Sequence, residues 1–249
     1  MYTIGLVGKH LSHSFSQKYF TEKFQKLGMN DYKYVNFEIN SVDEILEIIK
    51  QDDSIIGFNV TIPFKKEIIG SLNSIDVDAK KIGAVNTVKV KRVNDIVELH
   101  GHNTDAYGFQ FSVKPFLTLH HQKALILGTG GAANAVNYVL KNLGIDTLFV
   151  SRNTKNENCV LYADINEYAI NQYKLIVNCT PIGMFPNSEV LIDIPYSALT
   201  SEHLCVDLIY NPIKTKFLEH SEKNGATILN GLSMLHLQAD KAFEIFTSF

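Results

Sequence analysis

The chain has 249 residues, of which 45% are hydrophobic and 20% charged, and its formal net charge is −3. This length suits one large domain or two modest ones, and the near-neutral charge gives no electrostatic reason to expect a nucleic-acid or membrane partner. No apolar run approaches the roughly 20 residues of a membrane span, and MYTIGLVGKH lacks the basic leader and long apolar core of a signal peptide.

The cysteines and histidines argue against a disulfide framework and a metal centre. Cys159, Cys179 and Cys205 are odd in number and widely spaced, which suits neither paired disulfides nor a zinc site. His100 and His102 alternate along one predicted strand, and His120 is followed by His121 in a predicted loop, but neither pair has further ligands nearby. We therefore expect a reducing, cytoplasmic location and no metal.

The first hundred residues alternate between strand and helix patterns, which is typical of a mostly parallel α/β layer. A buried apolar run predicts the first strand, and helical spacing of apolar residues that ends at Gly28 predicts the first helix. In chain order we expect strand Tyr2–Val7, helix Ser16–Leu27, strand Tyr32–Glu38, helix Ser41–Lys50 and strand Ser54–Val60.

A second alternation follows a predicted pair of strands and a connecting helix. The pair is Val85–Lys91 and Asp95–His100 around the turn Arg92–Asn94, and a helix capped by Asn103 or Thr104 runs towards Pro115. We then expect a strand from Lys123, helix Ala132–Leu143, strands Thr147–Val150, Leu175–Cys179, Cys205–Ile209 and Ala226–Leu229, and a final helix Ser233–Phe249. The expected fold class is α/β with two α/β domains, in which the apolar C-terminal helix returns to the first domain.

Residues 124–133, ALILGTGGAA, combine a strand, a glycine turn and a helix start. Gly128 and Gly130 allow a tight turn and the close approach of a pyrophosphate to N–H groups at the helix N-terminus. Ala133 stands at the third fingerprint position, which accepts alanine. A loop that merely turns the chain is the alternative, but the strand–turn–helix context favours a Rossmann-type doubly wound dinucleotide-binding domain.

The second strand of this domain favours NADP over NAD. An NAD site usually places a carboxylate about 20 residues after the glycine loop to bind the ribose hydroxyls. Here the strand is followed by Ser151, Arg152 and Lys155, and the first carboxylate is Glu157. Arginine and lysine suit a 2′-phosphate, although they could also be ordinary solvated cations.

The stretch NVTIPFKKE, residues 59–67, places two lysines where a helix is expected to begin. The positive end of a helix dipole disfavours cations, so Lys65 needs either a partner or a function there. Lys66 is interpreted as a surface lysine.

Eight short motifs give the chain a clear resemblance to the shikimate dehydrogenase family. They occur in the family's order and cover nearly the whole chain. The motifs are HSFS (13–16), NVTIPFK (59–65), GAVNT (83–87), GHNTD (101–105), GTGGA (128–132), NCTPIGM (178–184), YNP (210–212) with Thr215 and Phe217, and Gly231 with Met234, Leu235, Gln238 and Ala239.

The resemblance implies a reversible NADPH-dependent reduction of 3-dehydroshikimate to shikimate, in the pathway to chorismate and aromatic amino acids. It implies a substrate-binding catalytic domain at residues 1–103 and 233–249, and an NADP-binding domain at 104–232. Substrate contacts would be Ser14, Ser16, Thr61, Asn86, Asp105, Tyr210 and Gln238. Cofactor contacts would be Gly128, Thr129, Gly130, Gly131, Ala132, Ser151, Arg152, Lys155, Thr180, Leu208 and Gly231.

Lys65 and Asp105 would be the catalytic pair, and acid–base chemistry agrees with this implication. Oxidation of an alcohol removes a hydroxyl proton, and reduction of the ketone delivers one. A helix start would lower the pKa of Lys65 and Asp105 would raise it, so the two would be tuned together across a cleft. Whether Lys65 transfers the proton or only orients and polarises the oxygen stays open. Hydroxyl and amide side chains suit the substrate's hydroxyls, although Ser14 or Ser16 could also serve as a helix N-cap.

Two positions depart from the family pattern, and two other functions stay open. Asn134 stands where the family often has a basic residue, and Cys179 stands where alanine is common. The chain is also somewhat short, with loops expected to be trimmed around Lys155–Cys159. The alternatives are a quinate or dual quinate/shikimate dehydrogenase, and a non-catalytic NADP-sensing protein on the same fold. A monomer or a homodimer is compatible with the sequence.

Overall fold

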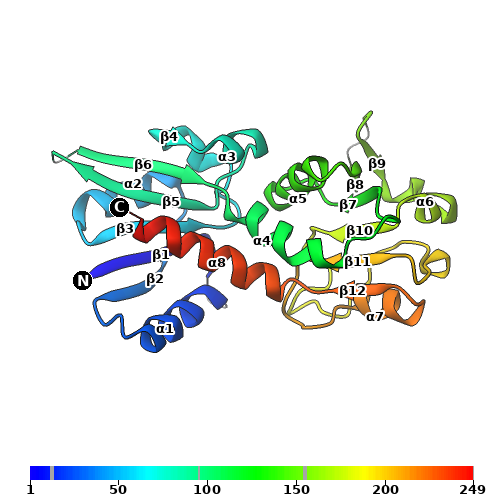
Figure 1. The fold of residues 1–249 in the computed structure, drawn as a ribbon. Helices are drawn as coiled ribbons and strands as arrows, with labels where there is room; N and C mark the ends of the chain where they lie inside the picture. The colour runs from blue at the N-terminus through cyan, green and yellow to red at the C-terminus, as the bar shows by residue number, and fades with distance from the viewer. Residues whose placement is uncertain (12–13, 95, 154–155, 249) are drawn as a thin grey trace. The chain divides into compact units, whose positions relative to one another are not determined.

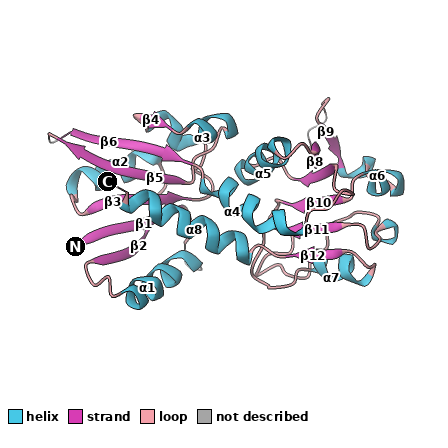
Figure 2. Cartoon of the chain, viewed as in Figure 1, coloured by secondary structure: helices cyan, strands magenta, loops and turns pink. Residues whose placement is uncertain are grey.

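A computed structural model of the chain describes residues 1–11, 14–94, 96–153 and 156–248. The chain divides into two compact units (Figure 1). Unit 1 comprises Met1–Thr104 and Ala239–Phe249, and unit 2 comprises Asp105–Gln238. In each unit a sheet is accompanied by helices (Figure 2), so the α/β fold class with two α/β domains is confirmed. Among the described residues, no helix combines the length and apolar character required for a membrane span.

Unit 1 is built on a mixed six-stranded sheet in the order β2-β1-β3-β5-β6-β4. The strands β1, β2 and β3 are parallel, whereas β5 runs antiparallel to both β3 and β6. The sheet is therefore less parallel than the alternation of elements predicted. The elements are β1 (Tyr2–Gly8), α1 (Phe15–Leu27), β2 (Tyr32–Glu38), α2 (Val42–Gln51), β3 (Ile55–Val60), the 3₁₀ helix η1 (Glu67–Ser71), β4 (Ser74–Ile75), α3 (Val77–Ile82), β5 (Thr87–Val93) and β6 (Ile96–His102).

Unit 2 is built on a parallel six-stranded sheet in the order β12-β11-β10-β7-β8-β9. The central strands β10 and β11 are buried along their whole length, as expected for a parallel sheet covered on both faces. The elements are α4 (Thr104–Val113), η2 (Lys114–Phe116), β7 (Lys123–Leu127), α5 (Gly131–Asn142), β8 (Asp146–Ser151), β9 (Cys159–Leu161), η3 (Tyr162–Asp164), α6 (Glu167–Gln172), β10 (Leu175–Asn178), η4 (Tyr196–Ala198), β11 (Leu204–Asp207), α7 (Lys216–Lys223), β12 (Thr227–Leu229) and α8 (Leu232–Thr247).

The C-terminal part of α8 packs in unit 1, as the sequence predicted. Ala239, Ala242 and Phe246 join the buried core formed by β1 and α1. Gly57 on β3 leaves room for the Phe246 ring, because an added Cβ would lie 2.3 Å from its Cδ1 atom. The Lys89 ammonium donates to the Ser248 carbonyl oxygen at the end of the helix, where the dipole favours a cation. A buried apolar face and one terminal cation thus attach this helix to the sheet.

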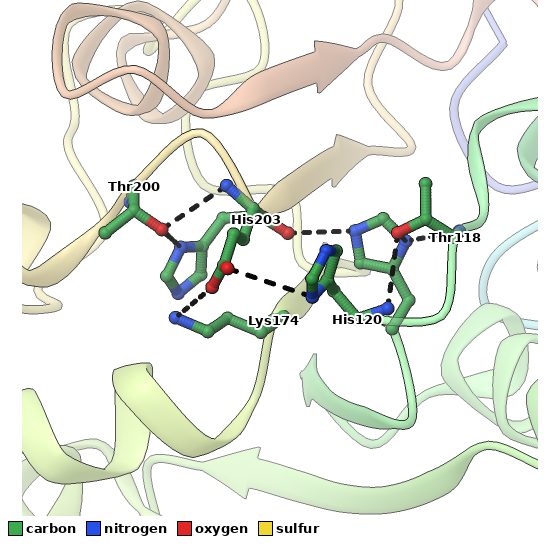
Figure 3. Close-up of polar contacts among 7 residues, drawn as sticks. Thr118, His120, Lys174, Thr200 and His203 are labelled. Carbon is green, nitrogen blue, oxygen red and sulfur yellow. Dashed lines mark hydrogen bonds and ion pairs between the residues drawn. The ribbon is translucent and has the colours of Figure 1, made fainter.

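Two identical histidine turns precede strands of the unit 2 sheet at its amino edge (Figure 3). The Thr118 N–H donates to His121 Nδ1 at 2.9 Å, and the Thr200 N–H donates to His203 Nδ1 at 2.9 Å. Backbone carbonyls can only accept, so His121 Nε2 donates to Glu202 O at 3.1 Å and His203 Nε2 donates to Ile170 O at 3.0 Å. Both rings are therefore neutral, with the proton on Nε2.

Burial lowers the pKa of both histidines, and the hydrogen bonds to the backbone carbonyls oppose it. Two neighbouring basic side chains face the Glu202 carboxylate. His120 Nδ1 lies 3.8 Å from it, and Lys174 Nζ lies 3.4 Å from it. A protonated ring would lose its Nδ1 acceptor, because that lone pair would carry the proton. These turns thus hold their loops only while the rings stay neutral. Among the described residues no cluster of three or more potential metal ligands occurs.

This arrangement predicts a loss of stability at mildly acidic pH. A histidine pKa that is lower in the folded state contributes stability above about pH 6.5, and the contribution disappears as the pH falls through the folded value. Urea unfolding at about pH 7.5 and about pH 5.5 measures it. His203→Asn keeps an acceptor near Thr200 but cannot titrate, so we expect it to be less stable at the higher pH and less sensitive to acid. The exposed His10 provides the control, His10→Asn, which should behave as wild type. Equal pH dependence in wild type and His203→Asn would contradict this account.

Candidate active site

The predicted substrate residues of unit 1 gather at one edge of its sheet. The segments that meet there follow β1, β3 and β6 and precede β5, which runs in the opposite direction. Ser14 is the N-cap of α1, and its Oγ accepts from the Ser16 N–H at 3.2 Å. The N-cap role considered for the serines is thus realised by Ser14, and both serines remain half-buried.

Thr61 is held at this edge by a backbone hydrogen bond and by the packing of its methyl group. Its N–H donates to Val7 O at 2.9 Å, which extends the parallel pairing of β1 and β3 by one residue. Gly8, at the end of β1, leaves space for the Thr61 side chain, since an added Cβ would lie 2.7 Å from Thr61 Cγ2. The glycine is needed here because Thr61 approaches the backbone closely.

Lys65 lies in a turn, and the expectation that it begins a helix is wrong. The next helical element is the 3₁₀ helix η1, which starts at Glu67 and has five residues. A dipole needs several aligned peptide groups, so η1 is a weak source of positive potential. The backbone of Lys65 is instead held by its neighbours, because Phe64 is 2% exposed and Lys65 O accepts from the Val85 N–H at 2.8 Å. Lys65 is half-buried and Lys66 is exposed, consistent with different roles for the two.

Asn86 directly precedes β5, and Asp105 is the second residue of α4, which follows β6. The Asn86 Oδ1 atom accepts from the Thr104 N–H at 2.7 Å, so this side chain satisfies the first N–H group of the helix. Asn86 is 3% exposed and Asp105, in the first turn of α4, is 7% exposed. Burial at a helix start distinguishes this carboxyl group from the solvated acids of the surface.

The strand order of unit 2 corresponds to the 3-2-1-4-5-6 order of a doubly wound dinucleotide-binding sheet, with β7 as strand 1 and β10 as strand 4. Such sheets bind ligands at the carboxyl ends of these two strands, where the strand order reverses. The predicted Gly128 turn follows β7, and Thr180 follows β10 by two residues. The sequence-predicted cofactor residues therefore lie at the switch point.

The Gly128–Ala132 segment has the geometry that a pyrophosphate requires. Gly128 has φ +107, and an added Cβ would lie 3.0 Å from Thr180 Cγ2, so a glycine is required by both conformation and space. Gly130 is the N-cap of α5, and within the described part of the chain no side chain caps its N–H groups. Thr129, Gly131 and Ala132 complete the turn, and the buried Ala133 lets the helix pack closely on the sheet. The cradle fits an anionic dinucleotide.

The segment after β8 presents an exposed cation. Ser151 ends the strand, its Oγ accepts from the Asn153 N–H at 3.3 Å, and Arg152 projects at the surface. The Arg152 charge also reaches the Tyr162 hydroxyl, where burial raises the pKa to about 12 and the arginine opposes the rise. Lys155, the other predicted phosphate contact, lies outside the described residues.

A buried polar network at the carboxyl ends of β10 and β11 supports Thr180. The Asn178 Oδ1 atom accepts from Thr180 N at 2.9 Å and from Thr180 Oγ1 at 2.6 Å, while Asn178 Nδ2 donates to Asp207 at 3.0 Å. Burial raises the pKa of Asp207 to about 6, against hydrogen bonds from Thr215, the Ile209 N–H and Asn178. Polar residues at the ends of short apolar strands were the signal for this network.

The remaining predicted contacts of unit 2 lie near the ends of β11 and β12 and on α8. Gly231 lies against the backbone of Leu208, since an added Cβ would be 2.1 Å from Leu208 O. Tyr210 is half-buried after β11, and Gln238 Nε2 donates to Leu235 O at 3.0 Å within α8. Leu208 and Gly231 are thus brought together. The structure assembles most of the predicted residues into two groups, one at an edge of each sheet.

Comparisons with known proteins show what the whole chain is similar to. The model of the shikimate dehydrogenase substrate binding domain matches residues 6–88. The shikimate dehydrogenase (NADP(+)) of Clostridium botulinum is 38% identical over 255 residues, which cover 99% of this chain and 96% of that protein.

Solved structures of similar proteins share the whole fold. The shikimate 5-dehydrogenase of Thermus thermophilus, in complex with NADP(H) and shikimate, has a TM-score of 0.85 and 27% identity, covering 100% of this chain and 94% of that chain. The quinate dehydrogenase of Corynebacterium glutamicum, in complex with NAD, has a TM-score of 0.87 and 25% identity, with the same coverage. The identity and coverage together show that the chain belongs to the shikimate dehydrogenase family.

Proposed function

We propose that this protein is an NADP-dependent shikimate dehydrogenase, which interconverts 3-dehydroshikimate and shikimate on the way to chorismate and aromatic amino acids. Family membership supports the reaction and the oxidoreductase class. The observation that carries the proposal in this chain is the glycine cradle at the switch point of a doubly wound sheet, followed after β8 by a cation instead of a carboxylate. The prediction of NADP as cofactor is confirmed at the level of the family.

Of the assigned substrate residues, four belong to unit 1 and three, Asp105, Tyr210 and Gln238, belong to unit 2, as do all assigned cofactor residues. We assign the substrate ring to Ser14, Ser16, Thr61, Asn86, Asp105, Tyr210 and Gln238, whose hydroxyl, amide and carboxylate groups match its hydroxyls. We assign the pyrophosphate to the Gly128–Ala132 turn and the 2′-phosphate to Ser151, Arg152 and Lys155, with Thr180, Leu208 and Gly231 beside the remainder of the dinucleotide. Bound NADP would supply the hydride chemistry.

Lys65 and Asp105 would act on the reacting oxygen of the substrate. In the reductive direction that oxygen gains a proton, and in the oxidative direction it loses one. We assign Lys65 to contact with this oxygen and Asp105 to hydrogen bonding and charge balance beside it. The structure supports these roles through the half-buried lysine on a backbone held by Phe64 and Val85, and through the buried carboxyl group at the start of α4.

The cysteines support a reducing environment for the protein. All three are described, and none of Cys159, Cys179 and Cys205 forms a disulfide. Burial raises the pKa of each thiol, which keeps it protonated and unreactive. We infer a cytoplasmic enzyme with a small-molecule substrate and no nucleic-acid partner, acting as a monomer or a homodimer.

Substrate oxidation with NADP tests the function directly. We expect NADP reduction with shikimate, and a lower kcat/KM with quinate, because quinate carries one more hydroxyl to accommodate. The likeness to a quinate dehydrogenase makes quinate oxidation the second candidate activity. A higher kcat/KM with quinate would favour that candidate, whereas no turnover of either substrate, despite NADP binding, would favour a sensor.

Lys65→Ala should lower kcat by about 100-fold or more and change KM for shikimate far less, because an acid–base group acts mainly in the transition state. Steady-state kinetics with saturating NADP measure both constants. The exposed neighbour provides the matched control, and Lys66→Ala should retain wild-type kinetics. A kcat for Lys65→Ala within about twofold of wild type would remove the assigned role.

Arg152→Ala should raise KM for NADPH by about tenfold or more and leave KM for NADH nearly unchanged, since only NADPH carries the 2′-phosphate that the guanidinium would bind. Reduction of 3-dehydroshikimate with each cofactor gives both constants. Lys141, exposed near the other end of α5, supplies the control variant Lys141→Ala. Equal losses for the two cofactors would overturn the phosphate assignment.

A further inference from the structure

A chain of buried polar side chains crosses the interior of unit 1 from β2 to the start of α4. Its members are Tyr34 on β2, Asn59 on β3, Thr87 on β5, and Asn86 and Thr104 at the two ends of the β5–β6 hairpin. Their exposed fractions are 4%, 7%, 0%, 3% and 1%, respectively. We call these five residues the polar relay. Buried polar groups in such number need a reason, because apolar side chains would fill a core without them.

The amide of Asn59 can adopt only one orientation. This orientation determines which member of each hydrogen-bonded pair in the relay is the donor. Its Nδ2 atom lies 3.4 Å from the backbone oxygen of Asn86, which can only accept a hydrogen bond. The same Nδ2 donates to Thr87 Oγ1 at 3.1 Å. The Oδ1 atom therefore faces Tyr34, whose hydroxyl donates to it at 3.0 Å.

The other end of the relay holds the first residue of α4. With its oxygen accepting from Asn59, the Thr87 hydroxyl donates to Asn86 Oδ1 at 3.1 Å. The same Asn86 oxygen accepts from the Thr104 N–H at 2.7 Å, and Asn86 Nδ2 donates to Thr104 Oγ1 at 3.0 Å. The Asn86 side chain thus binds both the backbone N–H and the hydroxyl of Thr104. Asp105 is the next residue along the helix.

The first end of the relay is the buried hydroxyl of Tyr34 on β2. Burial raises the pKa of the Tyr34 hydroxyl, and a hydrogen bond with the Ser16 side chain opposes the rise. The Tyr34 hydroxyl directs its proton to Asn59, so the relay begins with a donor whose acceptor is fixed. The relay therefore runs from a buried hydroxyl on β2 to the residue that precedes Asp105.

We propose that Tyr34, Asn59 and Thr87 are positioning residues of the active site, and that Thr87 acts through Asn86 and Thr104 to set the position of Asp105. This inference rests on the proposed function, because it assigns Asp105 a part in the reaction. A hydrogen-bonded network in a low-dielectric interior is stiff, and catalysis depends on small displacements of the groups that contact the substrate. A relay with only a structural role would instead affect stability and leave the kinetic constants of the folded protein unchanged.

Thr87→Val is the decisive variant, because it removes one hydroxyl and retains the shape of the side chain. We expect kcat for shikimate oxidation to fall about tenfold, equivalent to ~1.4 kcal/mol, with KM for NADP unchanged. Thr87→Ser restores the hydroxyl and should recover most of the rate. The control is Thr3→Val in the same sheet, since Thr3 is 1% exposed and its hydroxyl pairs with Ser54 Oγ at 2.7 Å, at the opposite edge.

Thermal unfolding of each variant separates stability from catalysis. Thr3→Val should lower Tm with wild-type kcat, whereas Thr87→Val should lower kcat in protein that is fully folded at the assay temperature. Wild-type kcat for Thr87→Val, or an equal loss for Thr3→Val, would overturn the proposal. If Thr87→Val does not fold, Tyr34→Phe takes its place, since it removes only the hydroxyl of the first relay member.

A double-mutant cycle with Asp105→Asn distinguishes failure of this inference from failure of the proposed function. If Thr87 acts through Asp105, Thr87→Val should have little further effect on kcat in the Asp105→Asn background. A full tenfold further loss would overturn the relay while leaving the catalytic assignment intact. Wild-type kcat for Asp105→Asn would overturn the catalytic assignment itself.

Discussion

The buried amide of Asn86 is the contact on which the proposed substrate edge depends. It satisfies the first N–H group of α4, binds the Thr104 hydroxyl and accepts from Thr87, all within a region that excludes water. Without it, a buried N–H group would lack its partner at a cost of about 1–3 kcal/mol. Thr104 is the last residue of this segment of unit 1. The hydrogen bonds from Asn86 therefore fix the position of the backbone at the unit boundary.

At the carboxyl edge of the unit 2 sheet, a buried side chain likewise binds several neighbouring donors, and here that side chain is a carboxylate. Asp207 ends β11 in full burial, and three donors converge on its carboxylate. Burial raises its pKa to about 6 despite those donors, so desolvation outweighs them. Asn178, which binds Asp207, also accepts a hydrogen bond from the Thr180 N–H group and so positions Thr180. The Thr180 methyl group in turn restricts the space beside Gly128. The glycine turn is therefore shaped from the neighbouring strand as well as by its own conformation.

The position of Lys65 has a different explanation from the one its sequence context suggested. No α-helix begins there in the described part of the chain, so a helix dipole does not account for a lysine at this point. The buried Phe64 anchors the turn, and the Val85 N–H binds the Lys65 carbonyl. Val85 directly precedes Asn86, so the backbone of Lys65 and the side chain that holds α4 belong to one hydrogen-bonded edge.

Local patterns in the sequence determined much of the architecture and the identity of the proposed site. Apolar runs located β1, β7 and β10, glycines in the left-handed region ended α1 and α5 at Gly28 and Gly144, and eight motifs indicated the family. The short elements β4, α3, β9, α6 and α7 were not predicted. Only the tertiary structure showed that Tyr34, Asn59 and Thr87 meet in one buried relay, that β5 runs antiparallel, and that Lys65 lies in a turn. Hydrogen bonds between residues 25 or more positions apart leave no local pattern, so folding alone decides which polar groups pair.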